Sequence, residues 1–167
     1  ARELLETAVA QWRKWRVVRQ SSRLLVVSAS IKAAKEYTEF LREQGLSAVV
    51  ATSDDDKACL RAIKRFKAGK IDVLITCQVA YEGLDVPAVS HIACLTNIRS
   101  YPWINQMAAR AVRIDPHAGP YESQQAHIFA PNDPMMLEIA RKIEEEQQAV
   151  RDDERAEYVK DALNALS

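Results

Sequence analysis

The polar side chains around residue 110 have the types and the spacing that phosphate binding requires. Gln106, Arg110 and Arg113 stand at positions i, i+4 and i+7, so a helix would present all three on one face. Two guanidinium groups about one helical turn apart suit bidentate hydrogen bonds to phosphate oxygens. Ordinary surface ion pairs are the alternative interpretation of the same pattern.

A short acidic turn lies upstream of this segment, between two apolar runs. It reads Glu82-Gly83-Leu84-Asp85. Gly83 permits close approach of a ligand to the backbone, and Asp85 can accept hydrogen bonds from ribose hydroxyls. Taken alone, the segment is more typical of a plain strand-to-strand turn. Together with the arginines, it predicts a surface that binds a sugar and a polyphosphate from one side.

The rest of the chain supplies the elements that position these groups. Strands are expected at 24–27, 46–51, 71–77, 90–96 and 125–130, and helices at 1–20, 31–44, 57–68 and 101–113. This alternation predicts an α/β fold in three layers, with a parallel sheet covered by helices on both faces. Ligands of such sheets bind at the carboxyl ends of the strands, where the acidic turn lies.

Apolar spacing indicates which side chains face the core. Trp12 and Trp15 share the apolar face of the leading helix, whose basic residues either are solvated or contact phosphate. Leu60, Ile63 and Phe66 are expected to point inward from the helix at 57–68. Ser30 is expected to cap the helix that begins at Ile31, and Ile104, Met107, Ala108 and Ala111 to lie opposite the arginine face.

The pattern changes at Pro134, where apolar residues become sparse among charges. A second helical stretch is expected from Asp152 to Leu166. We therefore predict a main domain at 1–133, with its leading helix at 1–20, and a helical extension at 134–167. The extension is expected to pack onto the sheet domain as a linking element, with partner docking as the alternative.

Composition excludes several classes of protein. The 167 residues carry no formal net charge, so a basic field over the whole protein is absent, although a local basic patch remains open. The three cysteines form no C-x-x-C pair, which favours reduced thiols in an intracellular, cytoplasmic protein over disulfides or a metal site. No apolar run approaches the ~18 residues of a membrane span, so no membrane partner is expected.

Three segments together resemble the second motor domain of superfamily 2 helicases and translocases. The strand from Leu24 to Ser28 resembles that family's motif IV, VLITCQVAYEGLDVP at 73–87 resembles motif V, and SYPWINQMAARAVR at 100–113 resembles motif VI. The resemblance covers about residues 20 to 130, in the order and spacing of the family. The context TNIRSYPWINQ is most similar to bacterial and phage DNA helicases and restriction-type translocases, rather than to the DEAD-box RNA branch.

This resemblance implies a RecA-like fold, of the P-loop NTPase type, and a role for each motif residue. Gly83 and Asp85, with Glu82 beside them, would line the nucleotide site. Arg110 and Arg113 would be arginine fingers that reach the γ-phosphate of ATP bound on the other motor domain, and Gln106 would orient or sense the same phosphates. Such fingers contribute a factor of roughly 10³–10⁵ to the rate of phosphoryl transfer.

The resemblance also places residues at the nucleic-acid backbone. These are Ser28, Ser30 and Cys77, with Thr76 as the alternative to Cys77, which stands where the family usually has Thr. Two further positions depart from the family pattern: Ala109 replaces the usual Gly of motif VI, and Gln78 replaces a frequent acid.

Two motifs of a complete motor are missing from the sequence. It contains no G-x-x-x-x-G-K-[ST] phosphate loop, and no apolar strand leads into an Asp-Glu pair for magnesium. ATP and Mg²⁺ would therefore be bound mainly by an N-terminal RecA-like motor domain of the same protein. The chain does not begin with Met, and we expect a fragment of a longer protein.

The main hypothesis is thus the second motor domain of an ATP-dependent helicase or translocase acting on DNA or RNA. The domain alone would not hydrolyse ATP, whereas the parent protein would. A degenerate motor domain that only binds nucleic acid or protein is the first alternative; the zero net charge and Cys77 favour it slightly, whereas the intact pair of Arg110 and Arg113 argues against it. A stand-alone nucleotide-binding enzyme is a third hypothesis, disfavoured by the absence of a glycine-rich phosphate loop.

Overall fold

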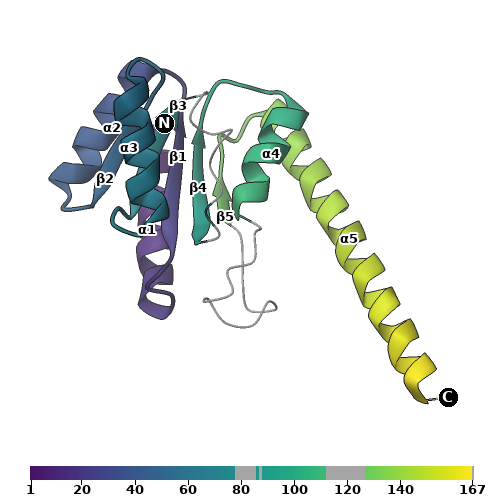
Figure 1. The fold of residues 1–167 in the computed structure, drawn as a ribbon. Coiled ribbons are helices and arrows are strands. Elements are labelled where there is room, and N and C mark those ends of the chain that lie inside the picture. The colour runs from purple at the N-terminus through teal and green to yellow at the C-terminus, as the bar shows by residue number, and fades with distance from the viewer. Residues whose placement is uncertain (78–85, 87, 112–126, 167) are drawn as a thin grey trace.

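The computed structural model describes residues 1–77, 86, 88–111 and 127–166. In chain order the described elements are α1 (Arg2–Val18), β1 (Arg23–Ser28), α2 (Ile31–Glu43), β2 (Ala48–Ala51), α3 (Asp56–Lys67), β3 (Val73–Cys77), β4 (Val89–Leu95), α4 (Tyr101–Ala111), β5 (His127–Phe129) and α5 (Pro134–Leu166). Apart from β3 and β4, which are consecutive among the described elements, strands and helices alternate up to α5, which confirms the predicted α/β fold (Figure 1).

The five described strands form one sheet in the order β2-β3-β1-β4-β5, and every pairing is parallel. The sequence order of the strands differs from their order in the sheet because helices connect parallel neighbours by crossovers. As a result, the carboxyl ends of all five strands meet at one edge, which we call the carboxyl edge.

Apolar side chains alternate between two cores on opposite faces of the sheet. On β1, Leu24 and Val26 pack with α1 and α2, whereas Leu25 and Val27 pack with α3, α4 and the start of α5. Strands buried on both faces read as continuous apolar runs, which is why β1 appears in the sequence as LLVV. The three-layer arrangement is therefore confirmed.

Most predicted boundaries hold within two residues, and one predicted orientation is wrong. Phe66 of α3 is fully buried and Ile63 partly buried, but Leu60 is 68% exposed. The inner face instead includes Ala62, which is buried, and Cys59, which is partly buried. The inner face of α3 thus contains smaller side chains than the sequence indicates.

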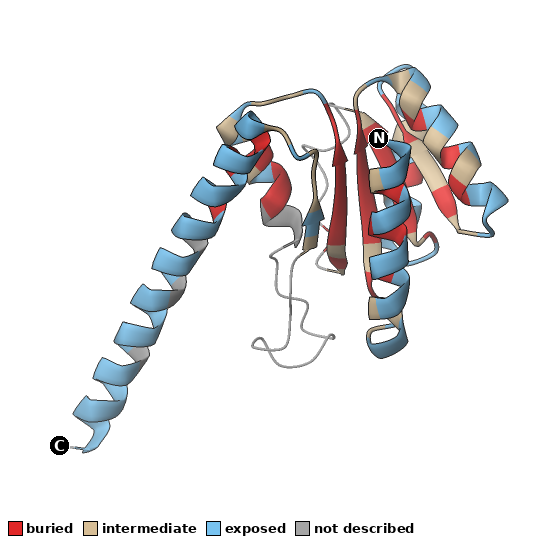
Figure 2. Cartoon of the chain, turned by 180° about the vertical axis from the view of Figure 1, so that it is seen from behind, coloured by how far each residue is buried: buried red, intermediate tan, exposed pale blue. Residues whose placement is uncertain are grey.

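The C-terminal extension is one continuous helix rather than two stretches. Met136, Ile139 and Ile143 at the start of α5 are buried in the core next to α4. Beyond them α5 projects away from the sheet, and its described side chains there are exposed (Figure 2). Packing onto the sheet domain is thus correct only for the first turns of the helix.

Candidate nucleotide and nucleic-acid site

Ser28 lies at the centre of the carboxyl edge. It is the last residue of β1, the middle strand, and stands in register with Cys77 of β3 on one side and Leu95 of β4 on the other. The Ser28 side chain is fully buried, and its hydroxyl has no hydrogen-bond partner within the described residues. Buried hydroxyl groups in proteins usually have a hydrogen-bond partner.

Ser30 follows directly and caps α2. Its side-chain oxygen accepts a hydrogen bond from the backbone N–H of Ala33 at 3.1 Å, as the sequence predicts. The cap satisfies one free donor of the first turn and fixes the direction in which α2 leaves the edge. The remaining N–H groups of that turn make the start of α2 a local positive pole beside Ser28.

The two neighbouring candidates on β3 differ in access. Thr76 is fully buried, and its hydroxyl donates to the carbonyl of Val26 inside the sheet, at 3.4 Å. Cys77 ends the strand and is only partly buried. Of the two alternatives for a backbone contact, Cys77 is therefore the one whose side chain reaches the surface.

Two clusters at the carboxyl edge were not predicted from the sequence as part of a site. In the first, Lys35 of α2 pairs with Asp54 in the loop after β2 at 2.7 Å, and the hydroxyl of Thr52 donates to the same carboxylate. The hydrogen bond from Lys35 lowers the pKa of Asp54 below its usual value, and the bond from Thr52 adds to this. The pair ties the start of α2 to the loop that leads into α3.

The second cluster joins the loops after β4 and β5. The Arg99 guanidinium donates to Asp133 at 2.7 Å and to the carbonyls of Thr96 and Ile98 at 2.8 and 2.9 Å. Asp133 also accepts from the backbone N–H of Met136 at the start of α5. The hydrogen bond from Arg99 holds the pKa of Asp133 below its usual value. One signal for this cluster was present: each of the two residues stands four positions after the end of a strand, and the two strands pair in the sheet.

Helix α4 begins two residues after Arg99 and presents the predicted polar face. Ile104, Met107 and Ala108 are buried against the sheet, whereas Gln106 is exposed. Arg110 lies on α4 one turn after Gln106, and its side chain falls outside the described part of the chain. Glu82, Gly83, Asp85 and Arg113 also fall outside it, so their predicted roles remain predictions.

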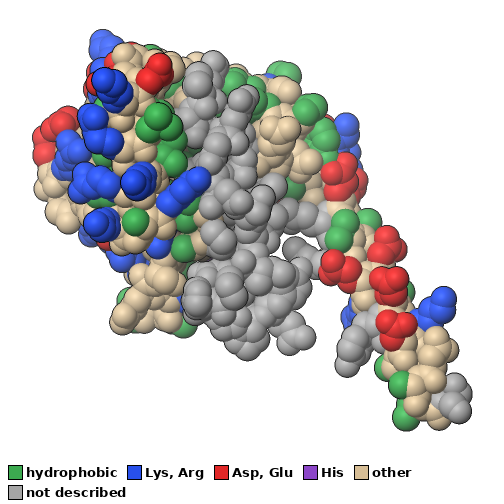
Figure 3. Space-filling view, viewed as in Figure 1, with side chains coloured by type: hydrophobic (Ala, Val, Ile, Leu, Met, Phe, Trp, Pro, Cys, Tyr) green, Lys and Arg blue, Asp and Glu red, His purple; other side chains and the backbone are tan. Residues whose placement is uncertain are grey.

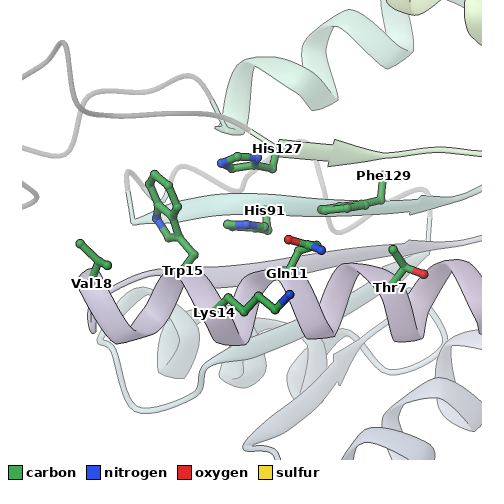
Figure 4. A pocket seen from close by; sticks show the side chains of 8 residues that line it. All are labelled: Thr7, Gln11, Lys14, Trp15, Val18, His91, His127 and Phe129. Carbon is green, nitrogen blue, oxygen red and sulfur yellow. The ribbon is translucent and has the colours of Figure 1, made fainter.

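A separate groove of about 440 Å³ lies between α1 and strands β4 and β5. Trp15, His91, His127 and Phe129 line it together with residues of α1 (Figure 4). The imidazoles of His91 and His127 are stacked with 4.5 Å between ring centroids, and the indole of Trp15 meets His127 edge-on at 5.1 Å. No pattern in the sequence predicts this cluster, although parallel register makes His91 and His127 partners across two strands.

Burial keeps this histidine pair uncharged near neutral pH. Desolvation, followed by the proximity of His127, lowers the pKa of His91 to about 4, and burial also lowers the pKa of His127. The hydroxyl of Ser90 shares a hydrogen bond with Nδ1 of His91 at 2.6 Å. The pair is therefore a packed aromatic element of the fold, with neutral rings stacked against each other.

The described residues do not include a metal centre. Within them, no group of three His, Cys, Asp or Glu side chains is placed to hold a metal ion. None of the described helices is long and apolar enough to cross a membrane.

Comparison with known proteins decides the family. The model for the helicase conserved C-terminal domain matches residues 7–115, which run from α1 past the end of α4. This chain belongs to that family. The match includes Ser28, Ser30, Cys77 and Gln106, as well as the segments that hold the predicted motifs V and VI.

Curated relatives agree with this helicase domain. UvrABC system protein B of Bifidobacterium longum subsp. infantis is 35% identical over 102 residues, which make up 58% of this chain and 14% of that protein. The protein of the same name from Tropheryma whipplei is 32% identical over 118 residues, 67% of this chain and 16% of that protein. The chain thus spans only 14–16% of the length of these two relatives.

Solved structures share the fold of this helicase domain. The Hef helicase domain of Pyrococcus furiosus aligns with a TM-score of 0.56 and 20% identity, over 83% of this chain and 28% of that one. Domain 2 of the DEAD-box helicase Mss116p, bound to an RNA duplex, aligns with a TM-score of 0.62 and 17% identity, over 86% of this chain and 55% of that one. The RecA-like fold inferred from the motifs is therefore confirmed.

Proposed function

We propose that this helicase C-terminal domain works as the second motor domain of an ATP-dependent DNA helicase or translocase. The observation that carries the proposal is the geometry of α4. Its buried residues Ile104, Met107 and Ala108 fix the helix on the sheet, and Gln106 is exposed on the opposite face. Helical periodicity places Arg110 on the same face as Gln106, where the proposed motor function requires a guanidinium that binds phosphate.

The nucleotide would lie between this domain and an N-terminal motor domain of the same protein. When bound there, Mg-ATP supplies the phosphoryl group whose transfer drives the motor. The residues of this chain would bind and position the nucleotide. Asp85 and Gly83, beside Glu82, would contact the ribose, and Arg110 and Arg113 would bind the γ-phosphate. Guanidinium groups there stabilise charge that develops in the transition state.

The nucleic-acid track would follow the carboxyl edge. Cys77, the partly buried register partner of the fully buried Ser28, reaches the surface there, and the helix N-terminus capped by Ser30 adds backbone N–H groups that attract phosphate. A track built from thiol and backbone groups contacts the sugar-phosphate backbone and does not read base sequence. DNA is the proposed substrate, because the segment from Thr96 to Gln106 resembles DNA helicases and translocases.

Single substitutions at the fingers test this proposal in the full-length protein. Arg110→Ala and Arg113→Ala should each lower the rate of nucleic-acid-stimulated ATP hydrolysis by about 10³-fold or more, because each removes a group that stabilises the transition state. Nucleotide affinity should change little. Arg155→Ala, which removes an exposed arginine on α5, is the matched control and should leave the rate unchanged.

Three results would contradict the proposal. ATP hydrolysis that persists in both finger variants would remove the assigned role of α4. Appreciable turnover by residues 1–167 alone would show that a second motor domain is not required. If the full-length protein binds nucleic acid but has no ATPase at all, the degenerate binding module is the correct function.

A further inference from the structure

The outer face of α3 carries a concentration of positive charge that the proposed motor function does not use. Between residues 56 and 70 the sequence has six basic residues and one acidic residue, in a chain whose formal net charge is zero. Figure 3 shows lysine and arginine side chains gathered over α2 and α3. A neutral protein that collects its positive charge on one element has a local field even without a global one.

Three of these side chains form a straight stripe. Lys57, Arg61 and Lys64 stand at positions i, i+4 and i+7, and all three are exposed. Their helix is fixed from the other side by Phe66 and Ala62, which are buried against the sheet. The stripe is therefore held on a rigid element and spans about 10 Å along the helix axis.

The stripe is also available for a ligand. Within the described residues, neither Lys57, Arg61 nor Lys64 has a carboxylate at ion-pair distance. The nearby acids are already engaged or lie at the helix start: Asp54 pairs with Lys35, and Asp55 caps α3 by accepting from the backbone N–H of Ala58. The cationic groups thus face solvent without internal compensation.

The chemistry of this face points to a sugar-phosphate backbone. Helix α3 begins at the carboxyl edge, after the loop that follows β2, and its stripe runs away from that edge. A duplex presents one phosphate per 3.4 Å of axis on each strand, so about 10 Å spans roughly three phosphates. Binding of unpaired bases uses exposed aromatic rings, whereas the aromatic residue of α3, Phe66, is buried.

We infer that Lys57, Arg61 and Lys64 form a binding surface for the backbone of a nucleic-acid duplex, outside the single-strand track. The surface holds the paired region next to the strand on which the motor acts. The inference rests on the proposed function only in taking nucleic acid as the substrate. It does not depend on ATP, on Arg110 or on Arg113.

A salt titration of residues 1–167 tests the inference. The probes are a 20-base-pair DNA duplex and one of its single strands, with affinity measured from 50 to 300 mM NaCl. The variant Lys57→Gln/Arg61→Gln/Lys64→Gln should bind the duplex at least tenfold more weakly at about 100 mM salt. Its slope of log affinity against log salt should be less steep by about 2–3, since each lost phosphate contact contributes about 0.9.

Three controls make the result specific. Lys142→Gln/Arg155→Gln/Lys160→Gln removes the same net charge from α5, and its affinity for the duplex should change less than threefold. Lys57→Arg/Arg61→Lys/Lys64→Arg keeps the charges and should bind as the original does. Single-strand affinity should change less than duplex affinity in the α3 variant, because the track lies elsewhere.

Equal loss of duplex affinity in the α3 and α5 variants would overturn the inference. So would an α3 variant that binds the duplex normally but changes the self-association of the chain in sedimentation, since α3 would then bind protein. If the unmodified chain binds the single strand but not the duplex, this inference fails while the proposed function stands. Absence of binding to both probes would count against the proposed function itself.

Discussion

Helices α3 and α4 cover the same face of the sheet and carry polar stripes at identical spacing, yet the structure secures them differently. The stripe of α3 is Lys57, Arg61 and Lys64, and the stripe proposed for α4 begins at Gln106. Helix α3 is held by its cap and its buried side chains. Helix α4 is held in addition by the loop before it, where the Arg99 guanidinium makes five hydrogen bonds to Asp133, Thr96 and Ile98.

This difference corresponds to two kinds of chemistry. Attraction of a phosphate backbone requires only charge at the surface, since much of its free energy comes from released counterions. Stabilisation of a transition state requires that the charged group be held within about 0.5 Å of the productive position. Equal spacing in the sequence therefore does not predict equal function. We propose that the hydrogen bonds of Arg99 distinguish the catalytic stripe proposed for α4 from the binding surface proposed for α3.

The largest expected effect concerns the two faces of α3. Phe66→Ala should lower the free energy of unfolding by about 3–5 kcal/mol, because it removes a fully buried ring and leaves a cavity under the helix. Leu60→Ala, on the same helix but 68% exposed, should change it by less than about 0.5 kcal/mol. Urea denaturation of residues 1–167 measures both.

The comparison between the two faces fails if the Leu60 variant is as unstable as the Phe66 variant. In that case the outer face of α3 would be covered in solution, and its cationic stripe would not be open to nucleic acid. A fold that keeps its stability in the Phe66 variant would instead show that the ring is not part of the core.

A smaller effect is expected at Arg99, which acts as a positioning residue for α4. In the full-length protein, Arg99→Gln should lower kcat of ATP hydrolysis by about 10- to 100-fold with little change in KM, because displacement of catalytic groups by about 1 Å can cost 10²-fold. Arg99→Lys should restore only part of the rate, since an ammonium group cannot reproduce the planar set of hydrogen bonds. Steady-state kinetics give the separate values.

The matched control for this prediction is Arg141→Gln on α5. Arg141 also pairs with two carboxylates, Glu138 and Glu145, but its side chain is 52% exposed. Exposed ion pairs contribute little to stability, so this variant should behave like the original protein. An Arg99 variant that unfolds more readily but keeps its kcat would show that the cluster stabilises the fold without positioning α4.

The sequence predicted the fold because its signals were local and consistent. Runs such as LLVV in β1 and the helices between the strands identify a parallel sheet, and the boundaries fall within two residues of the structure. Leu60 was misplaced because its spacing from Ile63 and Phe66 fits a helical pattern, whereas the structure buries the small residue Ala62 instead. The continuity of α5 was missed because its distal half has no core to define one apolar face.

The sequence predicted the site only where the position of a residue depends on neighbours close to it in the chain. Ser30 was identified as a cap from its position before an apolar helix, and Gln106 was placed on the exposed face of α4 by periodicity. The pair of Arg99 and Asp133 was missed because 34 residues separate its members along the chain. His91 and His127 were missed for the same reason, as only strand register brings them together.

The smallest expected effect is the pH dependence of stability, which concerns the histidine pair and not the α3 stripe on the opposite face of the sheet. His91 has a pKa of about 4 when folded and about 6.5 when unfolded, so the unfolded chain binds more protons between these values. Stability should therefore fall as the pH drops below 6.5, by about 2 kcal/mol at pH 5. Urea denaturation at pH 7 and pH 5 measures the difference, and His91→Phe should reduce it.

Duplex affinity should not follow the same curve, because lysine and arginine keep their charge over this range. At pH 5.5, while the chain remains folded, the α3 stripe should bind the duplex as it does at pH 7. A parallel loss of affinity and stability would mean that the stripe depends on the packing around His91. If duplex affinity stays constant while stability falls, the basic face of α3 is held in place by Phe66 and the core on that face of the sheet.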